Sequence, residues 1–485
     1  MCYVIGLDLG TTCIKALILD ETGRILSSAS RDDKLLTPHR GWAEQNAEHW
    51  VELSAEVIKE AVSEAAIDPG SIRALSVSSQ GITIVPVDRD YKPLRYALSW
   101  LDIRPENEIE FICSRISAED IFSITGKSLN PAYSLPKILW LMRNEPEIFR
   151  KTSKLLLPHD FLCAFLCGCP VTDHTMASGT MLYDLTTQQW SSRLLDLFEI
   201  DPCLLPVIKW SGTPVRTLTK EASHLTGLPE TTLLVTGGQD QKIAAHGASL
   251  KAGTATISFG TCAAMEFLLE SFPAFPSHGF AASSYISPET RVLEACINTA
   301  GAAIKWARDT LFPEMSFDDM NTLAESCTSS GGVFFYPFLQ GSGTPHNTSA
   351  QGAFTGLTLA ASKAELIRAI YEGIVMEVYT NLYSARIAGV TVEQLYIFGG
   401  GSKGAVINQM LADITGCEIQ AFSTTEMSAF GAAKLAASAI GIHNFTLPVS
   451  GIWEPDMTQN TRYKELYQLY QANIPAVLNL TPAIK

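Results

Sequence analysis

The chain has 485 residues, of which 46% are hydrophobic and 18% are charged, and its formal net charge is −15. This length exceeds what one hydrophobic core usually organises, so two large domains are expected. The acidic balance argues against a nucleic-acid partner and against an anionic membrane surface, because both attract basic proteins. An anionic nucleotide would therefore have to be held locally, by backbone donors and a metal ion.

The eleven cysteines are scattered, odd in number and without a pairing pattern, which favours a reducing cytoplasm as the location. The segment Cys2–Leu9 lacks the basic start of a signal peptide, and no apolar run is long enough to span a bilayer. We therefore expect neither a leader nor a membrane segment. Cys163, Cys167 and Cys169 cluster, but an apolar helix face explains them better than a metal site.

The first structured stretch is predicted to be a strand, a tight turn and a second strand. The apolar strand Ile5–Leu9 contains Asp8, the turn is Gly10-Thr11-Thr12, and the run Ile14–Leu19 follows. A carboxylate in a buried strand is costly without a partner, and a divalent cation could be that partner of Asp8. The turn offers a glycine for close approach and donors for a phosphate. A hairpin with a polar residue near its mouth is the alternative interpretation.

A strand from Arg24 to Ser30 and a long amphipathic helix from Asn46 or Ala47 to about Ala66 follow. The strand Ile72–Ser78 then leads into Gln80-Gly81. In the next segment, Leu98–Arg104, the side chains of Trp100, Asp102 and Arg104 alternate on one side of what we expect to be an extended chain. Aromatic faces with a few polar groups bind sugars, so these residues predict a pocket wall. A surface strand with a salt bridge is the alternative.

The middle of the chain contains mostly helices, followed by the second informative strand. That strand, Leu233–Thr236, ends in Gly237-Gly238, and Asp240-Gln241 comes at the start of a small-residue helix. A helix N-cap would explain Asp240, because Asp is favoured there. The paired glycines and Gln241 favour a catalytic base on a rigid element instead. The other predicted helices are Pro105 to Arg115, Ala118 to Ile124, Leu135 to Asn144, Glu365 to Ala388 and Ala405 to Thr415, and Asp160 is predicted to cap a further one.

The opening pattern recurs near the middle of the chain. Thr254–Phe259 is again an apolar strand, Gly260-Thr261 is again a Gly-Thr turn, and a second strand follows it. Two such hairpins predict a duplicated α/β domain that holds one nucleotide. After the buried strand Leu395–Phe398, the run Gly399–Gly401 precedes Ser402 and a helix, which suits a nucleotide lying against bare backbone. The small-residue helix from Ala429 to Gly441 is expected to let backbone approach the nucleotide.

These motifs together resemble the FGGY carbohydrate kinases of the actin-like ATPase superfamily, over nearly the whole length. The resemblance implies an α/β fold of two ribonuclease-H-like domains with a cleft between them, ATP and Mg²⁺, and phosphoryl transfer to a sugar hydroxyl. The expected domains are 1–246, with the sugar site, the first phosphate loop and the catalytic aspartate, and 247–485, with the second phosphate loop and the adenosine site. The motifs that carry the resemblance are Asp8-Leu9-Gly10-Thr11-Thr12, Trp100-x-Asp102-x-Arg104, Lys137-x-x-Trp140, Gly237-Gly238-x-Asp240-Gln241, Gly260-Thr261, Gly352-x-Phe354-x-Gly356-Leu357 and Gly399-Gly400-Gly401-Ser402-Lys403.

The resemblance also assigns roles residue by residue. Asp240 is similar to the general base, and Asp8 is similar to the residue that holds Mg²⁺. The other implied sites are larger sets. The nucleotide-binding residues would be Gly10, Thr11, Thr12, Lys15, Gly260, Thr261, Gly400, Gly401 and Ser402. The substrate-binding residues would be Gln80, Gly81, Trp100, Asp102, Arg104, Asp240 and Gln241.

The substrate is the least determined part of this interpretation. After Gln80, glycerol kinases have an Arg-Glu pair and xylulokinases have a Met-His pair, whereas this chain has Gly81-Ile82. The expected acceptor is a ketopentose such as xylulose, and another ketose or a polyol such as glycerol or erythritol is the alternative. Two other classes stay open: an ATP-driven conformational protein, and a catalytically silent regulator that binds sugar and ATP. A homodimer is the base-rate expectation for the assembly.

Overall fold

The computed structural model describes residues 2–269, 279–344, 346–347, 349–443, 445 and 447–479. The chain forms two compact units. Unit 1 consists of Met1–Ser249, Ala281–Val292 and Glu426–Leu447, and unit 2 consists of Leu250–Phe280, Leu293–Thr425 and Pro448–Lys485. The sequence analysis placed 281–292 and 426–447 in the C-terminal domain, but both segments cluster with the N-terminal part of the chain.

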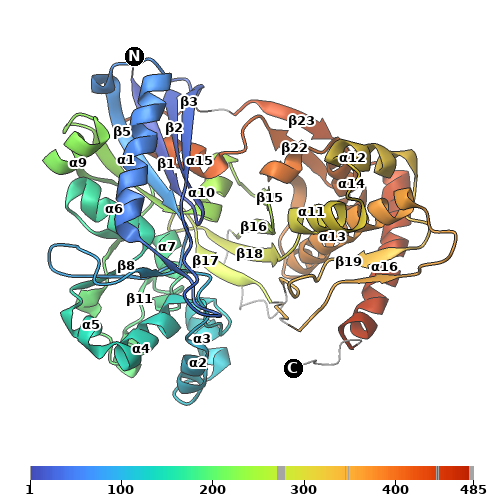
Figure 1. Cartoon of the computed structure of the whole chain (residues 1–485), viewed down its shortest axis with the longest axis horizontal. Coiled ribbons are helices and arrows are strands. Elements are labelled where there is room, and N and C mark those ends of the chain that lie inside the picture. Colours follow the sequence, from blue (N-terminus) through green and yellow to red (C-terminus); the bar gives the residue numbers. More distant parts are fainter. Residues whose placement is uncertain are drawn as a thin grey trace. The chain divides into compact units, whose positions relative to one another are not determined.

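Unit 1 is built on a six-stranded sheet with helices packed against it (Figure 1). The strands of this sheet are β1 (Tyr3–Leu9), β2 (Cys13–Asp20), β3 (Ile25–Asp32), β5 (Ile72–Ser79), β13 (Pro214–Thr217) and β14 (Leu233–Gln239). Its helices are α1 (Ala47–Glu64), α2 (Glu106–Cys113), α3 (Ala118–Thr125), α4 (Ser134–Asn144), α5 (Pro146–Lys151), α6 (Pro158–Cys167), α7 (His174–Ser178), α8 (Ser192–Leu197), α9 (Lys220–Thr226), α10 (Asp240–Gly247) and α15 (Met427–Ala439). Its short elements are β4 (Glu44–Gln45), η1 (Pro69–Ser71), β6 (Val85–Val87), β7 (Ala97–Leu98), β8 (Lys154–Leu156), β9 (Val171–Asp173), β10 (Tyr183–Asp184), β11 (Gln189–Trp190), η2 (Pro202–Leu204), β12 (Val207–Lys209) and β17 (Ala281–Ser284).

Unit 2 is a second, smaller α/β unit. Its strands are β15 (Gly253–Phe259), β16 (Ala263–Leu269), β18 (Arg291–Ile297), β19 (Phe334–Tyr336), β20 (Ala353–Thr355), β21 (Val392–Phe398), β22 (Glu418–Phe422) and β23 (Val449–Trp453). Its helices are α11 (Gly301–Leu311), α12 (Phe317–Ser326), α13 (Lys363–Ile387), η3 (Gly400–Lys403), α14 (Ala405–Thr415) and α16 (Met457–Asn479).

The two main sheets repeat one topology. In unit 1 the strand order is β13-β14-β5-β1-β2-β3, and in unit 2 it runs β18-β16-β15-β21-β22-β23. Each contains an antiparallel hairpin (β1–β2 and β15–β16), whose first strand pairs in parallel with a third strand (β5 and β21). A fourth strand continues in parallel (β14 and β22), and an antiparallel edge strand closes the set. The prediction of two duplicated ribonuclease-H-like units is confirmed.

Local sequence rules account for the first helix. α1 begins after Asn46, whose side chain accepts a hydrogen bond from the Glu48 backbone N–H, and this is the usual N-cap interaction. The predicted apolar face, which includes Trp50, Val57 and Ile58, is fully buried against the sheet. The N-cap of α6 is Leu157 rather than the predicted Asp160, which is the third helical residue and accepts from the Leu157 N–H at 3.0 Å.

The small-residue helix α15 packs on the sheet of unit 1. In Figure 1 it lies beside β1 and β2, although it comes more than 400 residues later in the chain. A Cβ added at Gly6 would lie 1.8 Å from the Ala429 carbonyl oxygen, and one at Gly431 would lie 2.0 Å from the Ile243 carbonyl oxygen. The small residues therefore let this helix approach strand and helix backbone within unit 1, as expected of a close-packed helix, and its approach to the nucleotide stays a prediction.

A buried glutamate links the two long helices of unit 2. Glu377 of α13 accepts a hydrogen bond from the Tyr470 hydroxyl of α16 at 2.8 Å. Burial raises the pKa of Glu377 from 4.5 to about 7. The carboxyl group is thus held in its neutral form in a range where an exposed glutamate is ionised.

We expect Glu377→Gln to flatten the pH dependence of the stability of unit 2. Between pH 4.5 and 7 the unfolded chain releases this proton and the folded chain keeps it, so the free energy of unfolding falls as pH rises. The loss across this window amounts to about 3 kcal/mol, at ~1.4 kcal/mol per pKa unit. Urea unfolding at several pH values measures the slope. The exposed Glu465→Gln on α16 is the control, and an unchanged slope in Glu377→Gln would contradict the assignment.

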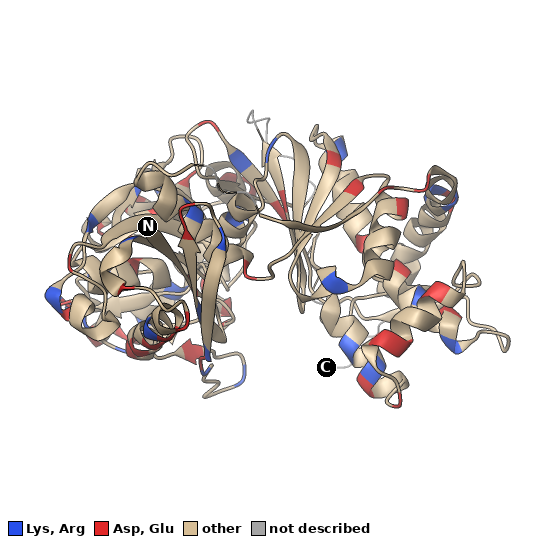
Figure 2. Ribbon diagram, turned by 90° about the horizontal axis from the view of Figure 1, so that it is seen from above, with Lys and Arg blue, Asp and Glu red and all other residues tan. Residues whose placement is uncertain are grey.

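Charged residues of both signs are interspersed over the elements of both units (Figure 2). No helix within the described ranges is long and apolar enough to cross a bilayer. All eleven cysteines are free thiols.

Candidate active site

The first turn, between β1 and β2, is fixed by side chains from two other segments. Its backbone closes through a hydrogen bond from the Gly10 N–H to the Cys13 carbonyl, at 3.1 Å. The indole N–H of Trp100 donates to Thr11 Oγ1 at 2.7 Å, and the amide of Gln45 donates to the Thr11 carbonyl at 2.8 Å. The side chain of Thr12 is exposed. Two predicted nucleotide residues thus lie at the end of β1, beside the exposed ring of a predicted substrate residue.

Asp8 has an unpartnered oxygen at the end of this strand. Its Oδ1 is inaccessible to solvent and has no hydrogen-bond partner among the described residues. Burial, and after it the neighbouring charge of Asp240, raise the pKa of Asp8 to about 7, against the lowering effects of Lys15 and Ser78. A buried carboxylate oxygen without a partner is a fitting ligand or second-sphere acceptor for Mg²⁺, which prefers oxygen.

Asp240 lies where β14 ends and α10 begins. The N-cap of α10 is Gln239, whose side-chain oxygen accepts from the Lys242 N–H at 3.3 Å. Asp240 is the first helical residue, and its Oδ1 accepts from the Gln241 N–H at 2.8 Å and from the Gln239 side-chain amide. The N-cap interpretation of Asp240 is therefore wrong. Its carboxylate is instead held by donors from the two residues beside it.

Side chains replace sheet hydrogen bonds along the strand end that carries Asp240. The register between β14 and β5 shifts between Val235 and Gly238, so the ladder is interrupted at Thr236 and Gly237 and resumes at Gly238. The Gly237 N–H donates to His159 Nε2 at 3.2 Å, and the Gln239 N–H donates to Thr175 Oγ1 at 2.8 Å. Because Nε2 accepts, His159 is protonated on Nδ1, which donates to Asp160 at 3.1 Å.

The two glycines allow this close packing. A Cβ at Gly237 would lie 1.8 Å from the Val77 carbonyl oxygen, and one at Gly238 would lie 2.4 Å from Thr175 Oγ1. The sequence predicted the glycine gap but attributed it to ligand access. It did not predict His159 or Thr175, because only the folded strand end brings them to its N–H groups.

We expect Thr175→Val to lower kcat more than it alters nucleotide affinity. The change leaves the Gln239 N–H without its acceptor, which costs about 1–3 kcal/mol and loosens the strand end one residue before Asp240. Thr175→Ser keeps the hydroxyl and should restore turnover. Steady-state kinetics and nucleotide titration measure both. The same substitution at the buried Thr226 of α9 is the control, and equal kcat losses at both positions would refute a local effect.

The predicted substrate loop follows β5. Gln80 is buried, and its amide donates to Gln45 Oε1 at 2.9 Å. A Cβ at Gly81 would lie 3.1 Å from Gln239 Cγ, so this glycine lies against the residue that precedes Asp240. Ile82 has a positive φ of 54°, an unfavourable conformation for a β-branched residue. Its carbonyl accepts from Ser134 Oγ at 3.1 Å and from Lys137 Nζ at 3.2 Å.

Lys137 is fully buried, and this burial lowers its pKa to about 7. Its hydrogen bond to the Ile82 carbonyl gives the Lys137-x-x-Trp140 motif a structural purpose. The lysine supports the strained backbone of the loop that begins at Gln80.

The prediction that Leu98–Arg104 is extended is wrong. β7 ends at Leu98, and the chain then turns, with the Asp102 N–H donating to the Ser99 carbonyl at 3.0 Å. The three side chains consequently do not share one side. Trp100 is 38% exposed, whereas the Asp102 and Arg104 side chains are buried as an ion pair of 2.6 Å.

Asp102 and Arg104 belong to a larger buried network. Arg104 also pairs with Glu44 at 2.7 Å and stacks over the Trp42 ring at 3.7 Å. Asp102 accepts from the Ala43 N–H at 2.7 Å. Of the alternative, a surface strand with a salt bridge, only the salt bridge is confirmed, because the segment turns and the ion pair is buried. Among the described residues, Arg104 Nη1 has no hydrogen-bond partner.

In unit 2 the second turn lies at the edge of a large cavity. The Gly260 N–H donates to the Cys262 carbonyl at 2.9 Å, as Gly10 does to Cys13 in the first turn. The N-terminus of α11 lies against this turn, with the Gly301 N–H bonded to the Gly260 carbonyl at 3.0 Å. The cavity has a volume of about 830 Å³, and Gly260, Thr261, Gly400, Gly401 and Lys403 are among its lining residues.

Aromatic side chains that the sequence analysis did not predict for this site also line the cavity. They are Phe259, Trp306, Phe317 and Tyr371. The Tyr371 hydroxyl donates to Asn321 Oδ1 at 2.9 Å, so the amide of this lining residue has a fixed orientation. An apolar cavity with a few oriented polar groups is the usual form of a small-molecule site. Aromatic residues in helices and strands most often belong to the hydrophobic core, so the sequence alone did not indicate that these four line a binding cavity.

The three consecutive glycines Gly399–Gly401, of which the last two line the cavity, have different surroundings. Gly399 has a φ of 91°, which favours glycine, and a Cβ at Gly401 would lie 1.8 Å from the Phe259 ring. Gly400 faces open space, with no atom within 4 Å of its would-be Cβ. Ser402 is buried, is not among the residues lining the cavity, and donates to the Gly399 carbonyl at 2.8 Å. Its hydroxyl therefore stabilises the glycine turn.

Two family profiles match the chain. Residues 3–247 match the N-terminal domain, and residues 255–440 the C-terminal domain, of the FGGY family of carbohydrate kinases. The chain therefore belongs to the FGGY family of carbohydrate kinases, which are actin-like ATPases in fold. It is an enzyme, a phosphotransferase that uses ATP and has an alcohol group as acceptor.

Individual relatives agree with this assignment. The chain is 29% identical to the xylulose kinase of Bacillus subtilis, over 100% of this chain and 99% of that protein. A ligand-bound xylulose kinase from Lactobacillus acidophilus superposes with a TM-score of 0.93, at 26% identity and 99% coverage of both chains. A gluconate kinase from the same species superposes equally well, with a TM-score of 0.93 and 26% identity.

Proposed function

We propose that this enzyme transfers the γ-phosphoryl group of ATP to a hydroxyl of a ketopentose such as xylulose, with Mg²⁺ as the metal. The observation that carries the proposal is the pair of carboxylates in unit 1. Asp8 is the last residue but one of β1, and Asp240 directly follows β14; these two strands flank β5. The two residues are close enough for the charge of Asp240 to raise the pKa of Asp8. Asp8 is suited to hold a cation, and Asp240 is suited to accept a proton.

Asp240 would accept the proton of the attacking hydroxyl, because its position is fixed by Gln239, Gln241 and the side chains that hold its strand end. Asp8 would hold Mg²⁺, directly or through water, and that ion would offset charge on the phosphates. Phosphoryl transfer needs positioning and charge stabilisation more than covalent chemistry, so these groups suffice.

The nucleotide and the sugar would occupy separate sets of residues. In unit 2 we assign the cavity of Gly260, Thr261, Gly400 and Gly401 to the nucleotide, with the lining aromatics against the base. The substrate set would be the residues near Asp240 in unit 1, foremost Gly81, Trp100 and Gln241. Asp102 would act by orienting Arg104. The Nη1 atom of Arg104 has no hydrogen-bond partner among the described residues and would donate to the ligand.

The functional division we propose assigns the acceptor, the first turn and the base to 1–246, and the second turn and the adenosine to 247–485. The free cysteines support a reducing cytoplasm as the location. A homodimer remains the base-rate expectation.

The ketopentose is supported by relatives that are themselves named xylulose kinases. Gly81-Ile82 in the acceptor loop is the reason to keep another ketose or a polyol as the alternative. The decisive experiment is an ADP-release assay with ATP and Mg²⁺ over ketoses, aldoses, sugar acids and polyols. We expect turnover of xylulose above the other compounds. Preference for another compound would overturn the ketopentose, and nucleotide binding without turnover of any would favour a silent regulator.

A further inference from the structure

Lys15 and Asp8 face each other across the first hairpin, yet they do not pair. The two residues are direct cross-strand partners in the β1–β2 register. Side chains at such positions lie on the same face, with Cβ atoms about 5 Å apart. An ammonium opposite a buried carboxylate normally neutralises it. Here the Asp8 Oδ1 has no partner among the described residues.

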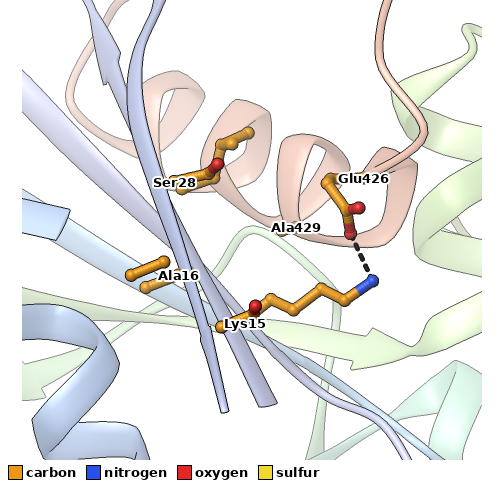
Figure 3. A pocket seen from close by; sticks show the side chains of 8 residues that line it. Lys15, Ala16, Ser28, Glu426 and Ala429 are labelled. Carbon is orange, nitrogen blue, oxygen red and sulfur yellow. Dashed lines mark ion pairs between the residues drawn. The ribbon is translucent and has the colours of Figure 1, made fainter. Parts of the chain in front are cut away.

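The Lys15 ammonium is paired with Glu426 instead. Nζ lies 2.6 Å from Glu426 Oε2, and Figure 3 shows the lysine chain reaching across a small pocket toward the start of α15. The pocket has a volume of about 90 Å³ and is lined by residues of β2, β3 and the start of α15. Burial lowers the pKa of Lys15, but the hydrogen bond and charge of Glu426 outweigh burial and raise it overall. The Lys15 side chain therefore stays charged, and its ammonium pairs with Glu426 rather than with Asp8.

The position of Glu426 is set by the helix that follows it. Glu426 is the first residue of the last segment of unit 1 and directly precedes α15. That helix contacts β1 at backbone distance, through Gly6 and Ala429. The hydroxyl of Ser428, the second residue of α15, donates to the Asp240 carbonyl at 3.3 Å. The position of the Glu426 carboxylate relative to the hairpin is thus set by the packing of α15.

We propose that Glu426 is a positioning residue that holds the Lys15 ammonium away from Asp8, so that the Asp8 carboxylate stays available to a divalent cation. Without Glu426, the ammonium turns to its cross-strand partner and competes with the cation for the same oxygens. The inference rests on the proposed function in one respect, that Asp8 serves the metal. In this proposal Glu426 acts through Lys15 and is not itself a ligand of the cation.

The test is a double-mutant cycle read by metal binding rather than by turnover. Mn²⁺ replaces Mg²⁺, and its free concentration is followed by electron paramagnetic resonance in the presence of ADP. We expect Glu426→Gln to raise the Mn²⁺ concentration at half-saturation about three- to tenfold, the size of a modest ion-pair effect. In the Lys15→Met background, where no ammonium can turn to Asp8, the same change should shift it by less than about twofold.

Glu56→Gln is the matched control, since Glu56 pairs with Arg31 of β3 at 3.4 Å, and it should leave Mn²⁺ binding unchanged. Glu426→Asp, which withdraws the carboxylate by one methylene, should give an intermediate shift and serves if Glu426→Gln does not fold. Equal shifts in both backgrounds, or none in either, would overturn the inference. Wild-type protein that binds no Mn²⁺ with ADP would instead refute the metal part of the proposed function.

Discussion

Replacing Asp240 with asparagine should lower kcat by at least about a hundredfold, the low end for the loss of a general base. The side chain keeps its size, and its oxygen can still accept from the Gln241 N–H, so the start of α10 is preserved. What it loses is the ability to take a proton from the acceptor hydroxyl. Nucleotide affinity should change little, because the assigned cavity consists of unit 2 residues.

Steady-state kinetics with the best acceptor, together with ADP titration, measure both quantities. Asp68→Asn is the control, since Asp68 is an exposed residue that caps η1 in the same unit. We expect Asp68→Asn to turn over at the wild-type rate. Turnover by Asp240→Asn near that rate would show that another group accepts the proton, and Asp240 would then be a structural residue of the α10 start.

Gly6→Ala should destabilise unit 1 by about 3 kcal/mol or more, the upper range for overpacking. The added methyl would lie 1.8 Å from the Ala429 carbonyl oxygen and 2.7 Å from the Ala433 backbone nitrogen. Both atoms belong to the backbone of α15, so no side-chain rotation relieves the clash. Either β1 or α15 has to move, and the hairpin with Asp8 and the anchoring of Glu426 move with it.

Thermal and urea unfolding measure this effect, with a melting temperature expected to fall by about 2–4 °C per kcal/mol for a unit of this size. Gly400→Ala is the matched control for stability, because no atom lies within 4 Å of its would-be Cβ and its φ is not positive. A melting temperature of Gly6→Ala equal to that of Gly400→Ala would mean that α15 does not pack against β1 as described.

The sequence predicted the parts of the fold whose signals are local. Both Gly-Thr hairpins were identified because the turn residues and the flanking apolar runs lie within about fifteen positions of each other. α1 was predicted with its cap and buried face for the same reason. Asp240 was proposed as the base partly because two glycines precede it, and in the structure both glycines are needed for close packing.

The features that the sequence did not predict depend on contacts between residues that are distant in sequence. The period-2 argument for Leu98–Arg104 could not foresee that Arg104 pairs with Glu44 and stacks on Trp42, which turns the segment and buries Asp102. Likewise, composition marked α15 as a close-packing helix but could not say that β1 is what it packs against. His159 and Thr175 carry no motif at all, because their role exists only at the irregular end of β14.

The late position of α15 in the chain has a consequence for synthesis. Unit 1 begins with the first strand but lacks α15 until residues 426–447 have left the ribosome, after the first two segments of unit 2 have been made. The sheet face around Gly6 stays uncovered during that time. Contacts between segments so far apart in sequence slow folding, and apolar surface is exposed until they form. A chain that stops before Glu426 lacks α15 and therefore cannot cover the sheet face around Gly6, so unit 1 cannot be completed from the N-terminal half of the sequence alone.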